Sequence, residues 1–307
     1  MKTDIRMIAF DLDGTLLTEE KILTPRTAEV LRRASSRGIE LLATTGRALS
    51  GIPDAVKILD GANYALTANG AGVYRRKDGI LDAWKQTLSE AAAEGLPSFE
   101  LDSEGSYDPL FENLMDRERT LALMDELSAL DVMPDPFIDG SCYMIAEKAP
   151  LVDRMDVTDS MKDYIRSSRT LISDMKSFLS DKTVQKITIN FAGDENGHRI
   201  DLQKVLDILN RYPEFTAVTG GIRNIEVSDR LATKGDAMLQ LASSLRICPE
   251  QIIAFGDSEN DITMLQKAGT GVAMENSLEI TKKAADAITL SNEEEGVAAY
   301  LEEKLGF

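Results

Sequence analysis

Short apolar runs alternate with helix-like stretches at both ends of the chain. Near the N-terminus, Met7–Phe10 and Ile39–Ala43 are predicted strands, separated by a predicted helix at Pro25–Arg37. Proline suits the first turn of that helix, and Gly38 suits its end. The C-terminal part continues the pattern, with strands at Gln251–Phe255, Gly271–Met274 and Ala287–Leu290 and helices at Asp261–Lys267, Ser277–Ala285 and Glu294–Leu305. This alternation, with right-handed crossovers, predicts an α/β fold whose parallel sheet is covered by helices.

The middle of the chain, from about Trp84 to Val227, lacks this regular alternation. Here we predict strands at Ser141–Ala146 and Lys186–Ala192, helices at Asp159–Ser180 and Arg199–Arg211, and a hairpin of Phe215–Val218 and Asn224–Val227 around Thr219-Gly220-Gly221. Mixed strands and helices of this kind indicate an α+β insertion. We therefore predict a core domain in two parts, residues 1–82 and 229–307, with an inserted domain at residues 83–228.

The composition narrows the classes of partner. The 307 residues carry a net charge of −18 and are 43% apolar, which is enough for a packed core. The negative charge argues against nucleic acid as a partner, because phosphate backbones are bound by Lys and Arg. It argues equally against charge-driven binding to an anionic membrane. No stretch approaches the roughly 18 to 20 apolar residues of a membrane span, and Met1–Arg6 lacks the apolar core of a signal peptide.

Several common kinds of site lack the residues they need. Cys142 and Cys248 are far apart and have no metal-type spacing. Two unpaired cysteines fit a reducing compartment, so we predict a cytoplasmic protein. The single histidine, His198, lies in a polar turn. Serine and cysteine triads and histidine-based zinc sites are therefore disfavoured, which leaves carboxylates, lysines and hydroxyls to carry any chemistry.

Two carboxylates follow the first predicted strand, in the sequence Asp11-Leu12-Asp13-Gly14-Thr15. Alternate residues of a continuing strand share a face, and Gly14 permits a sharp turn that brings a main-chain carbonyl to the same place. A calcium loop of the EF-hand type is excluded, because Thr15, Leu16 and Ile22 occupy positions that need an acid, a glycine and a glutamate. Taken alone, the pair indicates a plain Asp- and Gly-rich turn, a metal site, an acid–base pair, or a site that combines the last two.

Three further polar segments begin at predicted strand ends or helix starts. They are Thr44-Thr45-Gly46-Arg47 after the second strand, Lys234-Gly235 at the start of a helix with apolar Ala237, Met238, Leu241 and Leu245, and Gly256-Asp257-Ser258-Glu259-Asn260-Asp261 after the Gln251–Phe255 strand. Each alone is typical of a cap, a turn or a surface lysine. Because the C-terminal ends of parallel strands share one edge of a sheet, we predict that all four segments converge on one crevice.

In this order, the four segments resemble the motifs of the haloacid dehalogenase-like (HAD) hydrolases, in particular the Cof-type phosphatases of subclass IIB with a large α/β cap. The resemblance extends to Ala68-Asn69-Gly70-Ala71 and to Val272-Ala273-Met274-x-Asn276, and it covers nearly the whole chain. It implies a Rossmann-like three-layer parallel-sheet core with an inserted α+β cap domain. It also implies hydrolysis of small phosphomonoesters such as sugar phosphates or phosphorylated cofactors, with the cap selecting the leaving group.

The resemblance assigns different roles to the two opening aspartates. Asp11 is the expected nucleophile, which forms an aspartyl-phosphate, and Asp13 is the expected general acid and base. An acid role near neutral pH needs the pKa of Asp13 raised by roughly 2 to 3 units. Mg²⁺ prefers oxygen ligands and is expected on Asp11, the backbone carbonyl of Asp13 and Asp257. Asp261 is expected to be a further ligand or to support the ligands.

The remaining residues implied by the resemblance contact the phosphate or the substrate. Thr45 and Lys234 are expected to hold the transferring phosphoryl oxygens. Further phosphate or substrate contacts are expected from Gly46, Arg47, Asn69 and Asn260. The expected partner is a small phosphorylated metabolite, bound by a monomer or a small homo-oligomer. Two alternatives stay open: a phosphomannomutase-like phosphomutase, and a non-catalytic regulator that binds a phosphometabolite on an inactive hydrolase scaffold.

Overall fold

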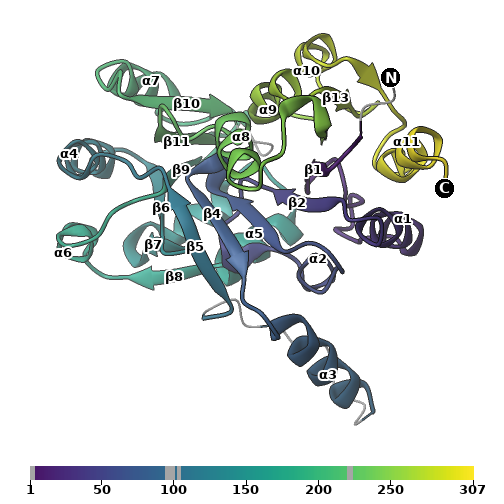
Figure 1. The fold of residues 1–307 in the computed structure, drawn as a ribbon. Coiled ribbons are helices and arrows are strands. Elements are labelled where there is room, and N and C mark those ends of the chain that lie inside the picture. The colour runs from purple at the N-terminus through teal and green to yellow at the C-terminus, as the bar shows by residue number, and fades with distance from the viewer. Residues whose placement is uncertain (1–3, 94–100, 102–104, 220–223) are drawn as a thin grey trace. The chain divides into compact units, whose positions relative to one another are not determined.

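The computed structural model describes residues 4–93, 101, 105–219 and 224–307. The chain forms two compact units, one of Met1–Phe111 with Thr233–Phe307 and one of Glu112–Ala232, so the second unit is inserted in the first (Figure 1). The inserted unit begins later than the predicted boundary between residues 82 and 83, and it ends later than residue 228. At the first boundary the difference arises because α3 (Ile80–Ala93) spans the predicted position, and β5 (Tyr107–Glu112) beyond it extends the sheet of the first unit.

The first unit is built on one eight-stranded sheet in the order β14-β13-β12-β1-β2-β3-β4-β5. The other strands are β1 (Met7–Asp11), β2 (Glu40–Thr44), β3 (Tyr64–Thr67), β4 (Gly72–Arg76), β12 (Ile252–Gly256), β13 (Thr270–Ala273) and β14 (Ala287–Ile288). Neighbouring strands from β14 to β3 are parallel, whereas β4 runs antiparallel to β3. The predicted α/β fold with a parallel sheet is confirmed.

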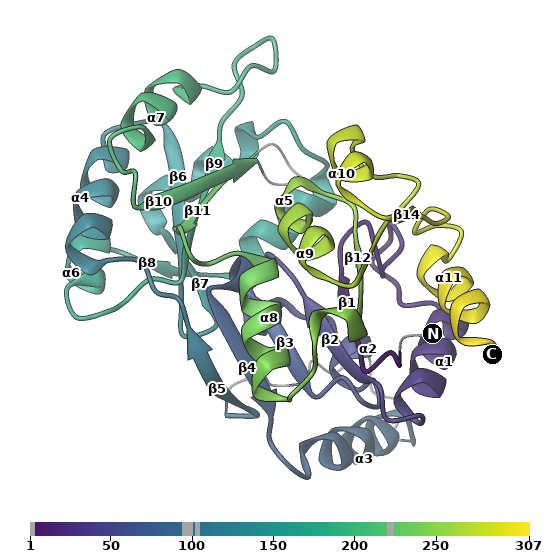
Figure 2. The same ribbon diagram turned by 45° about the horizontal axis from the view of Figure 1, so that its top comes forward.

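Two apolar layers cover the central strands of this sheet. Successive residues of a strand point to opposite faces, and all of β1 is buried. Ile8 and Phe10 pack with α1 (Pro25–Ser35) and α11 (Gly296–Leu305), which lie side by side. Met7 and Ala9 pack with α8 (Lys234–Ser244) and α9 (Ile262–Lys267). Helices therefore cover both faces, giving the predicted three layers (Figure 2).

Shorter elements connect these layers. They are η1 (Leu49–Gly51), α2 (Asp54–Lys57), η2 (Ala68–Gly70), η4 (Pro249–Gln251), η5 (Glu259–Asp261) and α10 (Glu279–Ala284). The start of α1 illustrates how the sequence sets an element. The Thr24 hydroxyl accepts a hydrogen bond from the backbone N–H of Thr27, and Pro25 occupies the first helical position.

The strand order reverses at β1, and this positions the candidate site. From β1 the sheet continues through β2 and β3 on one side and through β12 and β13 on the other. In an open parallel sheet, a crevice for a ligand forms outside the C-terminal strand ends at such a switch point. Asp11 is the last residue of β1, and Gly256 is the last residue of the neighbouring β12. The first and fourth sequence segments therefore begin at adjacent strand ends.

The second unit contains a six-stranded sheet in the order β10-β11-β9-β6-β7-β8. Its strands are β6 (Val132–Ile138), β7 (Ser141–Ile145), β8 (Arg169–Ile172), β9 (Lys186–Phe191), β10 (Phe215–Thr219) and β11 (Ile225–Asp229). Its helices are α4 (Arg117–Ser128), η3 (Ala146–Arg154), α5 (Asp159–Ser167), α6 (Met175–Leu179) and α7 (Leu202–Leu209). Among the described residues of this sheet, neighbouring strands run antiparallel except β7 and β8, which are parallel. One apolar face packs with residues of α4, α6 and α7.

Sequence predictions for this region are partly confirmed. β7 and β9 match two predicted strands, and β10 pairs with β11 as predicted for a hairpin, although Gly220 and Gly221 of its turn lie outside the described residues. The predicted helix Asp159–Ser180 is wrong, because β8 pairs with β7 in its middle. Asp174 caps a new helix, α6, by accepting from the N–H of Ser177, a start signal that the continuous-helix prediction overlooked. The predicted helix Arg199–Arg211 is shorter, as α7.

Candidate active site

A sharp turn follows β1 and fixes Asp11 at the edge of the sheet. The backbone N–H of Leu16 donates to the carbonyls of Asp11 and Leu12. Gly14 has a φ of 83°, and a β-carbon there would lie 2.7 Å from Oδ2 of Asp257. Only glycine therefore allows the turn to approach Asp257 this closely. The side chain of Asp11 is buried beneath the turn.

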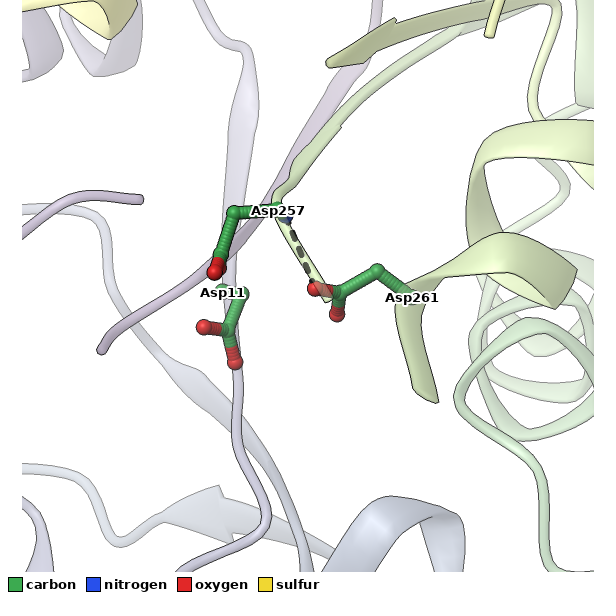
Figure 3. A group of neighbouring side chains, drawn as sticks. All are labelled: Asp11, Asp257 and Asp261. Atoms are coloured by element: carbon green, nitrogen blue, oxygen red, sulfur yellow. Dashed lines mark hydrogen bonds between the residues drawn. The ribbon is translucent and has the colours of Figure 1, made fainter. Parts of the chain in front are cut away.

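The segment after β12 brings two more carboxylates to the same place. Oδ2 of Asp261 accepts hydrogen bonds of 3.0 Å from the backbone N–H groups of Asp257 and Ser258. The carboxylate of Asp257 accepts from the hydroxyls of Thr15 and Ser258, at 2.9 Å and 2.8 Å. Figure 3 shows Asp11 on one segment, with Asp257 and Asp261 arriving from a second segment. Oxygen atoms of these three side chains lie within 4.8 Å of one another.

Lys234 joins the carboxylates from the first residue of α8. Thr233 caps this helix by accepting from the N–H of Asp236, so the helix begins at Lys234. The Lys234 side chain is completely buried. Its Nζ donates to Oδ1 of Asp11 at 2.5 Å and to Oδ1 of Asp261 at 2.6 Å. The segments that contain Asp11, Lys234 and Asp261 are thus joined at one ammonium group. This agrees with the prediction that the segments converge at one edge of the sheet.

The charges in this group are unequal, since one ammonium faces three carboxylates. Burial raises the pKa of Asp11 well above its ordinary value; the neighbouring carboxylates act in the same direction, and Lys234 opposes them. Burial and the charge of Asp261 raise the pKa of Asp257 to about 6. Burial alone would lower the pKa of Lys234, but Asp11 and Asp261 outweigh it and raise that pKa. Excess negative charge on oxygen ligands is the environment that suits a hard divalent cation such as Mg²⁺.

Asp13 lies beside this group but has its own cationic partners. Arg47 donates to both carboxylate oxygens of Asp13 at 2.7 Å, and Nζ of Lys21 lies 2.8 Å from Oδ1. Burial alone would raise the pKa of Asp13, but hydrogen bonds and charges from Arg47 and Lys21 lower it to about 2. The direction is opposite to the rise that a general-acid role requires. In the structure Asp13 is therefore a carboxylate, and a proton must be supplied before it can act as an acid.

The remaining predicted residues lie in the same unit. Thr45 is buried, and its hydroxyl accepts from the backbone N–H of Arg47. Gly46, between them, is partly exposed. Asn69 is buried, and its side-chain oxygen accepts a 3.0 Å hydrogen bond from Asn260. Arg47 connects this loop to Asp13, so the second sequence segment also reaches the acidic turn. Direct contacts of these side chains with a phosphate stay predictions.

Sequence reasoning missed four residues that hold the site together. Thr15 and Ser258 donate to Asp257, and Asn276 donates to the carbonyl of Gly14 at 2.8 Å. All three lie inside or beside the quoted motifs, so their positions contained the signal. Lys21 is different, because its sequence neighbours give no sign that it pairs with Asp13.

Other predictions concern sites outside this group. Cys142 and Cys248 are both free, as predicted, and His198 is exposed beside Asp194. Within the described ranges, no helix combines the length and apolar character needed to cross a membrane.

Comparisons with known proteins show the family of this chain. A model of the haloacid dehalogenase-like hydrolase family matches residues 8–97 and 103–301. Phosphatase YwpJ of Bacillus subtilis is 31% identical over 306 residues, covering 98% of this chain and 100% of that protein. The 5-amino-6-(5-phospho-D-ribitylamino)uracil phosphatase YwtE of the same organism is 25% identical, covering 98% of each.

Solved structures show the same fold. A haloacid dehalogenase-like hydrolase from B. subtilis has a TM-score of 0.75 and 26% identity, over 97% of this chain and 99% of that one. The HAD-superfamily protein BT1666 from Bacteroides thetaiotaomicron has a TM-score of 0.72 at 19% identity, over 99% of this chain and 97% of that one. With its sheet, its four converging segments and a family match over almost its full length, the chain belongs to the haloacid dehalogenase-like hydrolase family of enzymes.

Proposed function

We propose that this protein is a Mg²⁺-dependent phosphatase that hydrolyses small phosphomonoesters through an aspartyl-phosphate on Asp11. The observation that carries the proposal is the group of buried Asp11, half-buried Asp257 and buried Asp261 around Lys234. Phosphoryl transfer requires a nucleophile, positive charge on the phosphoryl oxygens and little else from the protein. The group contains a carboxylate and an ammonium within hydrogen-bonding distance of each other.

The donor set fits the proposed metal. Asp11 and Asp257 would bind Mg²⁺ together with the backbone carbonyl of Asp13, because hard divalent cations take oxygen ligands. Both side-chain oxygens of Asp261 already accept hydrogen bonds, from Lys234 and from two backbone N–H groups. Asp261 is therefore better suited to holding Lys234 and the loop of Asp257 than to direct ligation. When bound, the metal supplies positive charge that offsets the repulsion between Asp11 and a phosphate dianion.

Asp11 attacks the phosphorus atom, and the bond from phosphorus to the leaving-group oxygen breaks. Asp13 gives a proton to that oxygen and later takes one from the water that attacks the phosphorus of the aspartyl-phosphate. The second step releases inorganic phosphate and restores the Asp11 carboxylate. Throughout both steps, Lys234 and the Thr45 hydroxyl stabilise charge on the transferring oxygens.

The low pKa of Asp13 places a condition on the first step. Arg47 and Lys21 hold Asp13 ionised, which suits a base but not an acid. Phosphate oxygens are alternative partners for a guanidinium and an ammonium. We propose that substrate draws both cations away from Asp13, so that its pKa rises and the carboxylate takes up a proton from solvent, which it then gives to the leaving-group oxygen.

The names of two relatives support a proposal for the substrate class. YwpJ is named only as a phosphatase, whereas YwtE is named for a substrate that combines a phosphorylated ribityl chain with an aminouracil. We propose a small phosphorylated metabolite of this general kind, a sugar phosphate or a phosphorylated cofactor.

A phosphate-release screen over small phosphomonoesters, with and without Mg²⁺, tests the proposal. We expect Mg²⁺-dependent release by the unaltered protein and none by Asp11→Asn. Phosphate release by Asp11→Asn would overturn the nucleophile assignment, and release without any divalent cation would overturn the metal assignment. Transfer of the phosphoryl group within a sugar phosphate, without free phosphate, would instead identify a phosphomutase.

A further inference from the structure

The turn between β3 and β4 has an unusual backbone. Ala68, Asn69 and Gly70 have consecutive positive φ values of 49°, 60° and 105°. Residues with a β-carbon avoid this region, at a cost of about 1 to 3 kcal/mol each. Four-residue hairpin loops are commonly built around a type I turn, which needs no run of this kind. The chain could therefore reverse without placing Ala68 in a strained conformation.

The strained turn contacts the loop that follows β2. The backbone N–H of Ala68 donates to the carbonyl of Arg47 at 2.9 Å, and the N–H of Asn69 donates to the carbonyl of Thr45 at 3.1 Å. Both bonds depend on the direction in which the turn presents its N–H groups. The conformation of Ala68–Asn69–Gly70 is thereby tied to the segment that carries Thr45 and Arg47.

The same turn contacts the two segments that hold the ammonium group. The side-chain oxygen of Asn69 accepts from Asn260, which immediately precedes Asp261. A β-carbon on Gly70 would lie 2.4 Å from the carbonyl oxygen of Thr233, the residue before Lys234. Such a distance is too short for any real contact, so the absence of a side chain at Gly70 permits the approach.

We infer that Ala68–Asn69–Gly70 is a positioning turn, which sets where Lys234 lies relative to Asp261 and Thr45. One three-residue segment contacts all three of the loops that supply these residues. The Lys234 hydrogen bonds to Asp11 and Asp261, at 2.5 Å and 2.6 Å, depend on the placement of Thr233. A misplacement of about 1 Å at a catalytic group can cost on the order of 100-fold in rate. The kinetic consequence rests on the proposed function, whereas the placement of Lys234 does not.

Gly70→Ala tests the inference, with Gly38→Ala as its matched control. Gly38 also has a positive φ, of 80°, but nothing lies within 4 Å of where its β-carbon would be. Both substitutions place a β-carbon on a residue with a positive φ, and only the one at Gly70 pushes against Thr233. With 4-nitrophenyl phosphate as substrate, we expect Gly70→Ala to lower kcat about 100-fold with little change in KM. Gly38→Ala should leave kcat unchanged.

A pair of substitutions at Asn69 separates the turn's conformation from its side chain. Asn69→Gly and Asn69→Ala both remove the carboxamide, but only glycine accepts a φ of 60° without strain. We expect kcat of Asn69→Ala to be about fivefold to tenfold lower than that of Asn69→Gly. Equal kcat values in the two variants, together with equal values for Gly70→Ala and Gly38→Ala, would overturn the inference.

A spectroscopic readout keeps the inference testable if no phosphomonoester is hydrolysed. The buried Lys234 ammonium is protected from solvent and should give a resolved ¹⁵N-coupled proton signal, which Lys234→Met identifies by its loss. We expect Gly70→Ala to shift or broaden this signal and Gly38→Ala to leave it in place. An unshifted signal in folded Gly70→Ala contradicts the positioning role. Absence of phosphatase activity with a shifted signal contradicts only the proposed function.

Discussion

Each compact unit of this protein contains a buried lysine, and the two lysines have different surroundings. In the first unit, Lys234 contacts Asp11 and Asp261, with Asp257 in the same group. In the second unit, Lys186 lies 2.8 Å from Glu226, with Phe137 beneath its ammonium at 4.5 Å. Both lysine side chains are almost completely buried. Burial of a charge is therefore not what distinguishes a reactive site here.

The ratio of charges is the distinguishing feature. Around Lys234, three carboxylates face one ammonium group. On the sheet of the second unit, Lys186 pairs with Glu226, and Arg169 pairs with Asp135 at 3.4 Å. A buried pair of opposite charges can satisfy itself, whereas an excess of carboxylates needs a further cation. We therefore expect a metal and chemistry in the first unit and a structural role for the pairs of the second.

The largest expected effect on catalysis comes from removing the ammonium group of Lys234, with the same change at Lys186 as the comparison. Lys234→Met should lower kcat/KM for 4-nitrophenyl phosphate by roughly 10³-fold or more, the range found when a charge-stabilising group is lost from a phosphoryl-transfer site. Lys186→Met should leave kcat nearly unchanged and instead lower the free energy of unfolding by about 3 kcal/mol, because a buried ion pair with Glu226 is broken. Steady-state kinetics and urea unfolding of both variants measure this. Similar kinetic losses in the two variants would contradict the comparison.

The second unit should also show its own dependence on pH. Burial raises the pKa of Asp135 to about 7, although Arg169 and Asn190 oppose the rise. A carboxyl with a raised pKa in the folded state binds a proton that the unfolded chain has lost, so stability falls as pH rises from about 4 to about 7. The expected contribution is on the order of 4 kcal/mol. Urea unfolding of the unaltered protein and of Asp135→Asn across this range measures it, and a difference between the two that stays constant with pH refutes it.

Removing a carboxylate should weaken Mg²⁺ binding only when the carboxylate belongs to the first unit. Asp257→Asn should weaken Mg²⁺ binding by at least the roughly 10- to 100-fold that loss of a ligand's supporting partner costs. Asp135→Asn is the control, because Asp135 is also a carboxylate shielded from solvent, but it has Arg169 and Asn190 as partners. Isothermal titration with MgCl₂ compares the three proteins. Equal Mg²⁺ affinities would remove the metal from the group around Asp11.

The smallest expected effect concerns the exposed partner of Asp13. Lys21 and Asp13 are each more than a third exposed, and solvent screens such pairs. Lys21→Met should therefore raise the pKa of Asp13 from about 2 by only a fraction of a unit, whereas Arg47→Met should raise it further. Carboxyl-carbon NMR titration measures both shifts. A larger shift for Lys21→Met than for Arg47→Met would reverse the ranking of the two partners.

The sequence alone predicted the parts of the fold that depend on short-range patterns. Strand β1 and helix α1 carry clear apolar runs and cap residues, and they were located to within two residues. The convergence of Asp11, Lys234 and Asp257 was also predictable, because parallel strands end at one edge of a sheet. These predictions rest on chain direction and periodicity, which a sequence contains.

Long-range contacts were beyond the reach of these patterns. Strand β8 forms where a helix was predicted, because it pairs with β7. In this pairing Cys142 lies opposite Arg169, which is 27 positions later in the chain, so a local pattern does not reveal the contact. The pKa of Asp13 is lowered, where a rise was expected, chiefly because Arg47 hydrogen-bonds to it. This contact depends on how two loops fold together. The strain at Ala68 is likewise a property of its surroundings, because alanine itself gives no sign of a positive φ.

Chemical trapping tests the proposed role of Asp11 most directly. Borohydride reduces an aspartyl-phosphate to homoserine. The protein is therefore mixed with Mg²⁺ and an intact phosphomonoester that it hydrolyses, and the reaction is quenched with borohydride. The protein is then digested, and its peptides are sequenced by mass spectrometry. We predict homoserine at position 11, dependent on substrate and absent in samples without it. Homoserine at Asp13 or Asp257 instead, or phosphate release with no reduced residue at position 11, would contradict the assignment of Asp11 as nucleophile.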